Sequence, residues 1–356
     1  MRILLIKLSA IGDIVHTLPA FSAVRQALPD AEIDWVAESS AAEILRGNRL
    51  INRLIEIDTK HFRKNRSGRD LVAGLRMQTA AIRDSNYDVA VDFQGLIKSA
   101  IIARLSGAPL RFGYSRESLR EPAAAIFYNQ RIAAPQNHHI IYRHLQLAAS
   151  SFGIPIPKTL DFPIFPKEVH LAEAEKIARM AGGPFAMLNL GGGWPTKLWS
   201  AERFGQLGDL IAEHLGLRPI IVYGPGEEEI ANSAVASSKS GALITSSPSL
   251  KGFFALARLA SVYVGGDTGP THLAVAAGAP VVGIYGPTDW RRNGSPCPED
   301  LETGRNDIEC RKNCYRRSCD NWICMDIEVK AVFAAVARRL NAAVFEKLNA
   351  NTEAIK

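Results

Sequence analysis

Residues 262–274 read V-Y-V-G-G-D-T-G-P-T-H-L-A. An apolar strand runs into Gly265 and Gly266, and a helix follows Asp267-Thr268-Gly269 with His272 in its first turns. Glycines let the backbone approach a ligand closely, and the N-terminus of a helix offers unpaired N–H groups to an anion. The stretch is therefore typical of an α/β protein that binds a diphosphate, although an ordinary strand–helix turn with a capping Asp or Thr would share its pattern.

The same alternation of short apolar runs and helical periodicity extends over the whole chain. We predict strands at residues 3–8, 33–37, 54–57, 89–93, 110–114, 185–190, 219–223, 242–245, 262–264 and 280–285. Helical patterns lie between them, for example at residues 15–28 and 71–83, and an Ala-rich helix is predicted at 329–348. Strands that alternate with helices indicate parallel sheets covered on both faces.

A proline-rich segment divides this pattern into two halves. Residues 153–167 read G-I-P-I-P-K-T-L-D-F-P-I-F-P-K, and four prolines in fifteen residues cannot continue a helix or a central strand. We predict an N-terminal Rossmann-like domain over 1–160 and a C-terminal Rossmann-like domain over 161–335. A C-terminal helix over 336–356 could pack back on the N-terminal domain. Ligands of such sheets bind beyond the carboxyl ends of the strands, so two doubly wound domains are expected to face each other across a cleft.

Composition and charge narrow the classes of function. The 356 residues are 47% hydrophobic and carry a net charge of +6, and this excess lies in residues 1–165, which hold 21 Lys and Arg against 15 Asp and Glu. A basic half favours an anionic partner. Nucleic acid is not expected, because few aromatic side chains are interleaved with the basic clusters.

Two turns of the first half carry polar residues directly after predicted strands. The first, Ser9–Asp13, places a carboxylate where a helix begins; Asp13 is interpreted as either a cap of that helix or a general base for a substrate hydroxyl. The second, Asp92–Ala100, places Lys98 at the start of a helix, where a cation opposes the helix dipole and suggests an anion to bind.

Two turns of the second half complete the predicted donor site. L-G-G-G-W-P-T-K-L-W-S, residues 190–200, joins three glycines to Lys197 and suggests a phosphate cradle, although its spacing is not that of a Walker A loop. Y-G-P-G-E-E-E, residues 223–229, places Glu227 where a carboxylate can bind ribose hydroxyls, or where it can complement a helix dipole. No G-x-G-x-x-G follows the first strand, which disfavours a dinucleotide oxidoreductase, and no D-x-D offers a carboxylate site for a divalent metal.

These segments together resemble the ADP-heptose:lipopolysaccharide heptosyltransferases, glycosyltransferase family 9, over nearly the whole chain. The matching segments are I-K-L-S-A-I-G-D-I-V-H-T-L-P-A, D-F-Q-G-L-I-K-S-A, K-L-W-S-A-E-R-F, D-T-G-P-T-H-L-A and V-V-G-I-Y-G-P-T-D. Arg120-Glu121-Pro122 through Phe127-Tyr128-Asn129 is most similar to the heptosyltransferase I branch, which adds the first heptose to Kdo. The resemblance implies the GT-B architecture of two Rossmann-like domains and an inverting glycosyltransferase without a cofactor or metal.

The resemblance also implies roles for individual residues. Asp13 would be the catalytic base, and cations of the first half would face the anionic Kdo and lipid A phosphates. The implied donor-binding residues are Gly192, Gly193, Lys197, Glu227, Asp267, Thr268, Gly269 and His272, and the implied acceptor-binding residues are Arg63, Lys64, Lys98 and Arg120. Family members can carry hydroxyl side chains in the phosphate loop, whereas this chain has Gly191–Gly193, so backbone N–H groups would have to bind the phosphates.

The implied partners are ADP-heptose, Kdo-lipid A and the surface of the inner membrane. The N-terminus, M-R-I-L-L-I-K-L, is interpreted as a buried strand rather than a signal peptide, and no apolar run reaches the roughly 18–20 residues of a membrane helix. We therefore expect a cytoplasmic protein that binds the inner membrane peripherally. The alternatives are a sibling transferase with another acceptor, such as heptosyltransferase II, and a non-catalytic nucleotide-sugar-binding protein.

One segment departs from the heptosyltransferase I pattern. Cys310, Cys314, Cys319 and Cys324 fall within fifteen residues, and Cys297 lies upstream. Their spacing is not the C-x2-C of common zinc sites, and a cytoplasmic location disfavours stable disulfides. A structural metal site, disulfide pairing and packed free thiols therefore remain open.

Overall fold

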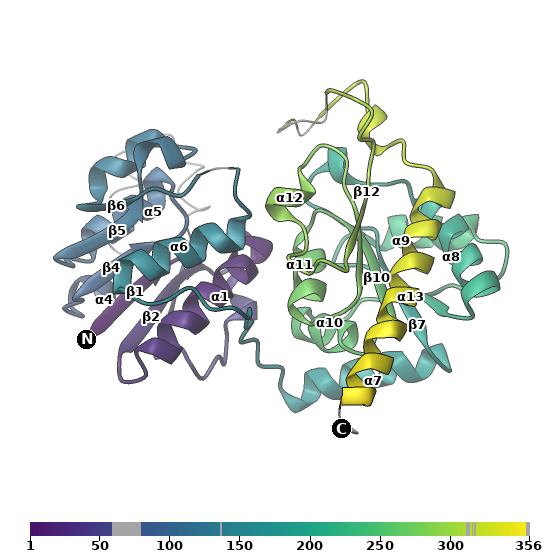
Figure 1. Cartoon of the computed structure of the whole chain (residues 1–356), viewed down its shortest axis with the longest axis horizontal. Helices are drawn as coiled ribbons and strands as arrows, with labels where there is room; N and C mark the ends of the chain where they lie inside the picture. The colour runs from purple at the N-terminus through teal and green to yellow at the C-terminus, as the bar shows by residue number, and fades with distance from the viewer. Residues whose placement is uncertain (59–79, 136, 311–313, 315, 317, 354–356) are drawn as a thin grey trace. The chain divides into compact units, whose positions relative to one another are not determined.

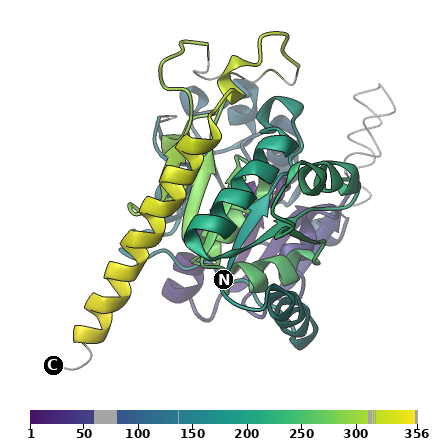
Figure 2. The ribbon, with the colours of Figure 1, turned by 90° about the vertical axis from the view of Figure 1, so that its right-hand side faces the viewer.

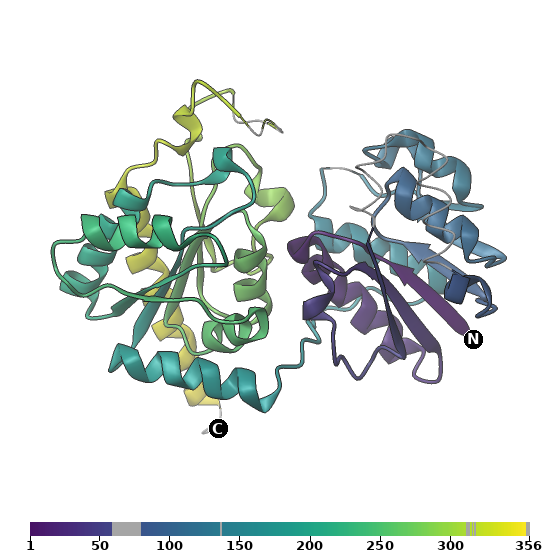
Figure 3. The same ribbon diagram turned by 180° about the vertical axis from the view of Figure 1, so that it is seen from behind.

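The computed structural model describes residues 1–58, 80–135, 137–310, 314, 316 and 318–353, with the side chains of residues 81 and 342–353 excepted. The chain divides into two compact units, Met1–Phe165 and Pro166–Lys356. Residues 154–167 join them and contain no helix or strand; this linker is visible in Figure 1 and, from behind, in Figure 3. The unit boundary therefore falls five residues beyond the predicted one at 160/161.

The first unit contains one six-stranded parallel sheet in the order β3-β2-β1-β4-β5-β6. Its strands are β1 (Arg2–Ile6), β2 (Glu32–Glu38), β3 (Arg53–Ile57), β4 (Val89–Asp92), β5 (Leu110–Tyr114) and β6 (Gln130–Ile132). Its helices are α1 (Ile11–Ala27), η1 (Ala42–Ile44), α4 (Ala80–Arg83), α5 (Ile97–Leu105), η2 (Arg116–Ser118), η3 (Pro122–Phe127) and α6 (Ile140–Phe152). Most of the predicted helix at 71–83 lies outside the described residues.

The second unit repeats this topology with a sheet in the order β12-β11-β10-β7-β8-β9. Its strands are β7 (Phe185–Asn189), β8 (Arg218–Val222), β9 (Ile244–Ser246), β10 (Val262–Gly266), β11 (Val281–Ile284) and β12 (Leu301–Thr303). Its helices are α7 (Glu168–Ala181), η4 (Pro195–Lys197), α8 (Ala201–Leu215), α9 (Glu228–Ser237), α10 (Leu250–Ala257), α11 (Gly269–Ala276), α12 (Trp290–Asn293), η5 (Ile323–Met325) and α13 (Val329–Glu353). Both orders are the Rossmann order, so the prediction of two doubly wound sheets is confirmed.

Burial explains why the central strands form. Ile3, Leu4, Leu5 and Ile6 of β1 are completely buried, as expected for a strand with helices on both faces of its sheet. The prediction missed β6 and β12, which are the short outer strands of the two sheets and have three residues each. Three residues are too few to show a periodicity by themselves, and the equally short outer strand β9 was predicted only as the end of the run 242–245.

Helices cover both faces of the second sheet (Figure 1). α8 packs against α9 and α13, and α10 packs against α7 and α11. Figure 2 shows α13 and α8 side by side. The predicted boundary at 335/336 falls inside α13, which is one helix from Val329 onwards and packs on β10, β11 and β12 of its own unit.

Among the described residues, no helix has both the length and the apolar character that crossing a bilayer would require.

Candidate active site

The predicted donor site lies where the strand order of the second sheet reverses. β7 and β10 are neighbours in the sheet although β8, β9 and the helices around them separate the two strands in sequence. Asn189 pairs with Gly265 near their carboxyl ends. The chain leaves β7 and β10 in opposite directions across the sheet, so the turns that follow them flank the crevice in which such folds bind ligands. These are the turns that hold Lys197 and Asp267.

Asp267 is the centre of a buried charged cluster in this crevice. Lys197 Nζ lies 2.6 Å from Asp267 Oδ2, and His272 Nε2 lies 3.4 Å from Asp267 Oδ1. Burial by itself raises the pKa of Asp267, but the hydrogen bond from His272 and the charge of Lys197 outweigh it and hold that pKa well below its usual range. The carboxylate is therefore ionised and fixes the two side chains that the sequence assigned to diphosphate binding.

An aromatic ring also positions the Lys197 ammonium. Lys197 Nζ lies 4.8 Å from the centroid of the Trp194 ring, a distance at which a cation is attracted to the face of an indole. The sequence analysis did not assign Trp194 a role. Its position three residues before the lysine, on the same short loop, was the available signal.

The N-terminus of α11 faces the same crevice. Thr268 is the N-cap residue, and its side chain is more than nine-tenths buried yet makes no capping hydrogen bond. Within the described part of the chain, Thr268 Oγ1 has no hydrogen-bond partner. A hydroxyl and the free N–H groups of the first helical turn are together a suitable site for a phosphate oxygen.

The three glycines of the phosphate loop differ in what surrounds them. A Cβ on Gly191 would lie 2.0 Å from Glu227 Oε2, and one on Gly192 would lie 2.8 Å from Thr268 Cγ2, whereas one on Gly193 would meet no atom within 4 Å. Gly191 and Gly192 thus allow close packing inside the site, while Gly193 borders open space. The expectation that backbone N–H groups of this loop bind phosphate stays a prediction.

Glu227 is held at the end of β8, beside this loop. Its Oε2 accepts a hydrogen bond of 2.8 Å from Gly224 N, and its carboxylate packs on Gly191. The side chain is partly exposed and makes no ion pair among the described residues, so it can still accept hydrogen bonds from a ligand.

The cysteine-containing segment and the residues directly after it make hydrogen bonds to the predicted phosphate loop and to the start of α8. Thr196 Oγ1 donates to Arg316 O at 2.8 Å, and Trp322 Nε1 donates to Thr196 O at 3.3 Å. Trp199 Nε1 and Arg203 NH1 both donate to Ile327 O, each at 3.0 Å. Lys197 follows Thr196 directly, so these contacts help to fix the position of its backbone.

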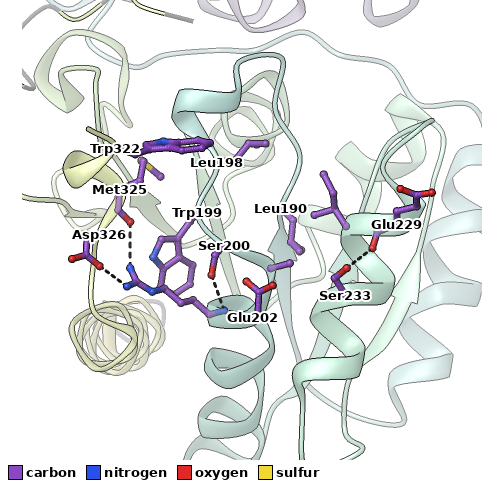
Figure 4. A pocket seen from close by; sticks show the side chains of 13 residues that line it. Leu190, Leu198, Trp199, Ser200, Glu202, Glu229, Ser233, Trp322, Met325 and Asp326 are labelled. Atoms are coloured by element: carbon purple, nitrogen blue, oxygen red, sulfur yellow. Dashed lines mark hydrogen bonds and ion pairs between the residues drawn. The ribbon is translucent and has the colours of Figure 1, made fainter. Parts of the chain in front are cut away.

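A pocket of about 550 Å³ lies between this segment and the start of α8 (Figure 4). Its lining residues are Leu190, Leu198, Trp199, Ser200, Ala201, Glu202, Arg203, Glu229, Ile230, Ser233, Trp322, Met325 and Asp326. None of the predicted donor-binding residues lines it. The pocket is therefore distinct from the crevice that holds Lys197 and Asp267.

In the first unit, Asp13 lies beyond the carboxyl end of β1, again where the strand order reverses. It is the third residue of α1 and not its N-cap, which is Ala10, and its Oδ2 accepts a hydrogen bond of 3.0 Å from Ala10 N. Asp13 is therefore not the N-cap residue itself, but as the third helical residue its carboxylate caps the backbone N–H of Ala10, as in a capping box. The carboxylate is partly exposed, so a substrate hydroxyl can reach it.

Gln94 joins the turn before Asp13 to the turn after β4. Its Oε1 accepts hydrogen bonds from Leu8 N at 3.0 Å and Ser9 N at 3.1 Å. Asp92, at the end of β4, is completely buried and accepts from Tyr128 OH at 2.6 Å and from Gln94 N at 2.8 Å. Asp92 thus shapes this turn rather than meeting a substrate, a role that only its burial reveals.

The predicted acceptor-binding residues are placed only in part. Lys98 Nζ forms a 2.9 Å ion pair with Glu38 Oε1, whose side chain is 3% exposed. Arg120 is exposed between η2 and η3, and Arg63 and Lys64 lie outside the described residues. The two described cations lie on neighbouring parts of the chain, since Ile97 N donates to Glu121 Oε2 at 2.8 Å.

The described cysteines are free thiols. Burial, and then the neighbouring Cys310 and Cys314, raise the pKa of the Cys324 thiol, so these thiols lie near one another. No group of three or more His, Cys, Asp or Glu in the described residues is arranged to hold a metal ion.

Known proteins are similar to this chain in sequence and in fold. The chain matches glycosyltransferase family 9 (heptosyltransferase) over residues 76–322. It is 30% identical to lipopolysaccharide heptosyltransferase 1 of Pseudomonas aeruginosa over 319 residues, 90% of this chain and 87% of that protein. It is also 30% identical to lipopolysaccharide heptosyltransferase 1 of Escherichia coli K12 over 312 residues, 87% and 93% of the two chains.

Solved structures agree with this match. E. coli heptosyltransferase WaaC with ADP has a TM-score of 0.71 at 30% identity, covering 85% of this chain and 92% of that chain; WaaC has also been solved with ADP-2-deoxy-2-fluoro heptose. E. coli ADP-heptose lps heptosyltransferase II has a TM-score of 0.74 at 18% identity, covering 96% and 99%, which shows the shared fold. The two Rossmann-like units are those of the GT-B class. The chain therefore belongs to glycosyltransferase family 9, the heptosyltransferases, and is a glycosyltransferase.

Proposed function

We propose that this enzyme transfers heptose from ADP-heptose to a Kdo hydroxyl of the lipopolysaccharide inner core, with inversion and without a metal. The observation that carries the proposal is the buried Lys197–Asp267 ion pair at the N-terminus of α11. Lys197 supplies a cation there, Thr268 supplies a buried hydroxyl, and the start of α11 supplies backbone N–H groups. A leaving diphosphate needs such groups at one place. The names of the relatives at 30% identity support heptose as the transferred sugar.

The donor is proposed to bind along the carboxyl edge of the second sheet. Lys197, Thr268 and Gly192 would bind the diphosphate, and His272 would act through Asp267. Glu227, anchored at Gly224, would accept hydrogen bonds from the ribose hydroxyls.

Asp13 is proposed as the general base of a single displacement. Its carboxylate takes the proton of the acceptor hydroxyl while that oxygen forms a bond to the anomeric carbon of the heptose. The bond from the anomeric carbon to the β-phosphate oxygen breaks on the opposite face, and its electron pair leaves with ADP. Lys98, Arg120, Arg63 and Lys64 are proposed to bind the anionic acceptor, in keeping with the basic first half of the chain.

The test measures ADP release from ADP-heptose in EDTA, with and without Kdo-lipid A. We expect release only when the acceptor is present. Release with a heptosylated core but not with Kdo-lipid A would instead establish a sibling transferase with a later acceptor. Binding of ADP-heptose without release on any acceptor would contradict the proposal.

Asp13→Asn should lower the transfer rate by roughly 10²–10⁴-fold, because the base is lost, while ADP binding stays unchanged. Asp30→Asn is the matched control, since Asp30 is an exposed carboxylate of the same unit. Turnover by Asp13→Asn within a few-fold of the wild-type rate would exclude Asp13 as the base.

We also propose that the enzyme works at the cytoplasmic face of the inner membrane as a peripheral protein. The excess of positive charge in residues 1–165 should favour binding to anionic vesicles, and added salt should weaken this binding. Sedimentation with phosphatidylglycerol-containing vesicles, compared with phosphatidylcholine vesicles, measures this. Equal binding to both, or binding that salt does not weaken, would argue against it.

A further inference from the structure

Three neighbouring strands of the second sheet are each followed or ended by a buried polar atom without a partner. Asn189 ends β7, Thr268 follows β10 and Thr288 follows β11, and these strands are adjacent in the sheet. Each residue is less than a tenth exposed. Among the described residues, nothing makes a hydrogen bond to Asn189 Oδ1, Thr268 Oγ1 or Thr288 Oγ1. An unpaired buried polar atom lowers the stability of the fold, so three along one edge suggest a ligand that supplies the missing partners.

The order of the turns along this edge can be compared with the order of the groups in a nucleotide-sugar donor. Glu227 follows β8, Lys197 follows β7, Thr268 follows β10 and Thr288 follows β11, which is the order of these strands in the sheet. Under the proposed function, the ribose lies at Glu227 and the diphosphate at Lys197 and Thr268. Neighbouring strands are about 4.8 Å apart, so the next turn lies one such step beyond the phosphates. The group attached beyond the diphosphate is the transferred sugar.

Packing holds the Thr288 turn in this position. Gly266 of β10 pairs with Ile284 of β11, and burial together with the charge of Asp267 raises the pKa of Tyr285 well above its usual value. The start of the β11 turn is therefore next to the Asp267 cluster. A Cβ on Gly286 would lie 2.2 Å from Met325 Sδ, so the turn also packs tightly against η5.

From this arrangement we propose that the Thr288 hydroxyl binds the glycosyl group of the nucleotide-sugar donor and helps to select the sugar. A hydroxyl can both donate and accept, which matches the hydroxyls of a sugar. The inference rests on the proposed function, because it takes the donor to be an ADP-linked sugar. It assigns Thr288 to the sugar alone and leaves the phosphates to Lys197 and Thr268.

Calorimetric titration of Thr288→Val with ADP and with ADP-heptose tests this assignment. Valine keeps the shape and removes the hydroxyl, so ADP affinity should stay within twofold while ADP-heptose affinity falls roughly three- to tenfold. Thr288→Ser restores the hydroxyl and should recover the affinity for ADP-heptose. Thr288→Ala provides the same comparison if the valine variant does not fold.

Two results would overturn the assignment. Equal loss of affinity for ADP and ADP-heptose would place Thr288 at the phosphates or in the fold itself, and unchanged affinity for both would show that the hydroxyl binds nothing. Wild-type protein that binds ADP but not ADP-heptose would refute the heptose donor, and with it a contact between Thr288 and heptose. That failure is seen without any variant, so the two failures are distinguishable.

Discussion

Asp267 is the residue on which the donor site depends, because it fixes two neighbouring side chains at once. Its carboxylate is 5% exposed and bonds Lys197 on one oxygen and His272 on the other. An ionised carboxylate is stable at such depth only when it is paired. The cation that we propose for the donor phosphates is therefore set in place before a ligand binds, which avoids a reorganisation cost.

The low pKa of Asp267 predicts how its contribution to stability changes with pH. A carboxylate whose pKa is lower in the folded than in the unfolded state stabilises the fold above its unfolded pKa of about 3.9 and loses this as the pH falls through the folded value. The free energy of unfolding of wild type should therefore exceed that of Asp267→Asn at pH 8. The difference should be at least as large at pH 5 and should shrink below about pH 4. Urea unfolding followed by tryptophan fluorescence measures this, since four of the five tryptophans lie in the second unit. A difference that disappears between pH 8 and pH 5 would show that the ion pair is not what stabilises the site.

At the scale of elements, the glycine loop after β7 packs closely against the acidic turn after β8. The Glu227 carboxylate occupies the space that a side chain at position 191 would take, and Gly224 N donates to the same oxygen, Oε2. The two turns meet because β7 and β8 are paired over their whole length. The loop that we propose to bind phosphate thus also sets the position of the carboxylate proposed for the ribose.

Gly191→Ala should weaken ADP binding about as much as Glu227→Ala does, because the new methyl group displaces a flexible carboxylate rather than the backbone. The two changes should not add, since they remove the same contact. Isothermal titration of the single and double variants with ADP tests this coupling. Gly183→Ala is the matched control, because Gly183 precedes β7 at the other end of the strand and its Cβ would meet none of the described atoms within 4 Å. Additive losses in the double variant would mean that Gly191 serves the site in some other way.

At the scale of the whole molecule, a buried ion pair attaches α13 to the second sheet. Arg339 Nε lies 2.8 Å from Asp300 Oδ1, and both side chains are nearly fully buried. Asp300 also accepts from Val281 N and Ser295 Oγ, so it links α13, the start of β11 and the loop before β12. Val332 and Val336, on the apolar side of the same helix, are completely buried.

Arg339→Met should lower the free energy of unfolding of the second unit by about 3–5 kcal/mol, because it leaves the Asp300 carboxylate buried without its cation. Urea denaturation reports the change. Arg305→Met is the matched control, since Arg305 pairs with Asp307 at the surface and should change little. If both variants unfold alike, the Arg339–Asp300 pair does not hold α13 in place.

Much of this architecture was determined by the sequence itself. Apolar runs such as Leu4–Ile6 and Val262–Val264, separated by helical periodicity, predicted two doubly wound units, and the proline-rich segment predicted their division. The turn chemistry around Asp267 and Lys197 predicted two turns that the structure places together at the carboxyl edge of the second sheet. These properties are local, because the spacing of apolar residues close together in the chain predicts a strand or a helix.

Only the tertiary structure decided which of these residues meet. Lys197 and Asp267 are 70 residues apart, and they pair because β7 and β10 lie side by side in the strand order. The same order aligns Glu227, Thr268 and Thr288 along one edge, buries Arg339 against Asp300, and leaves β6 and β12 as three-residue outer strands. Such contacts depend on how distant segments cross over one another, and no local pattern in the sequence encodes that.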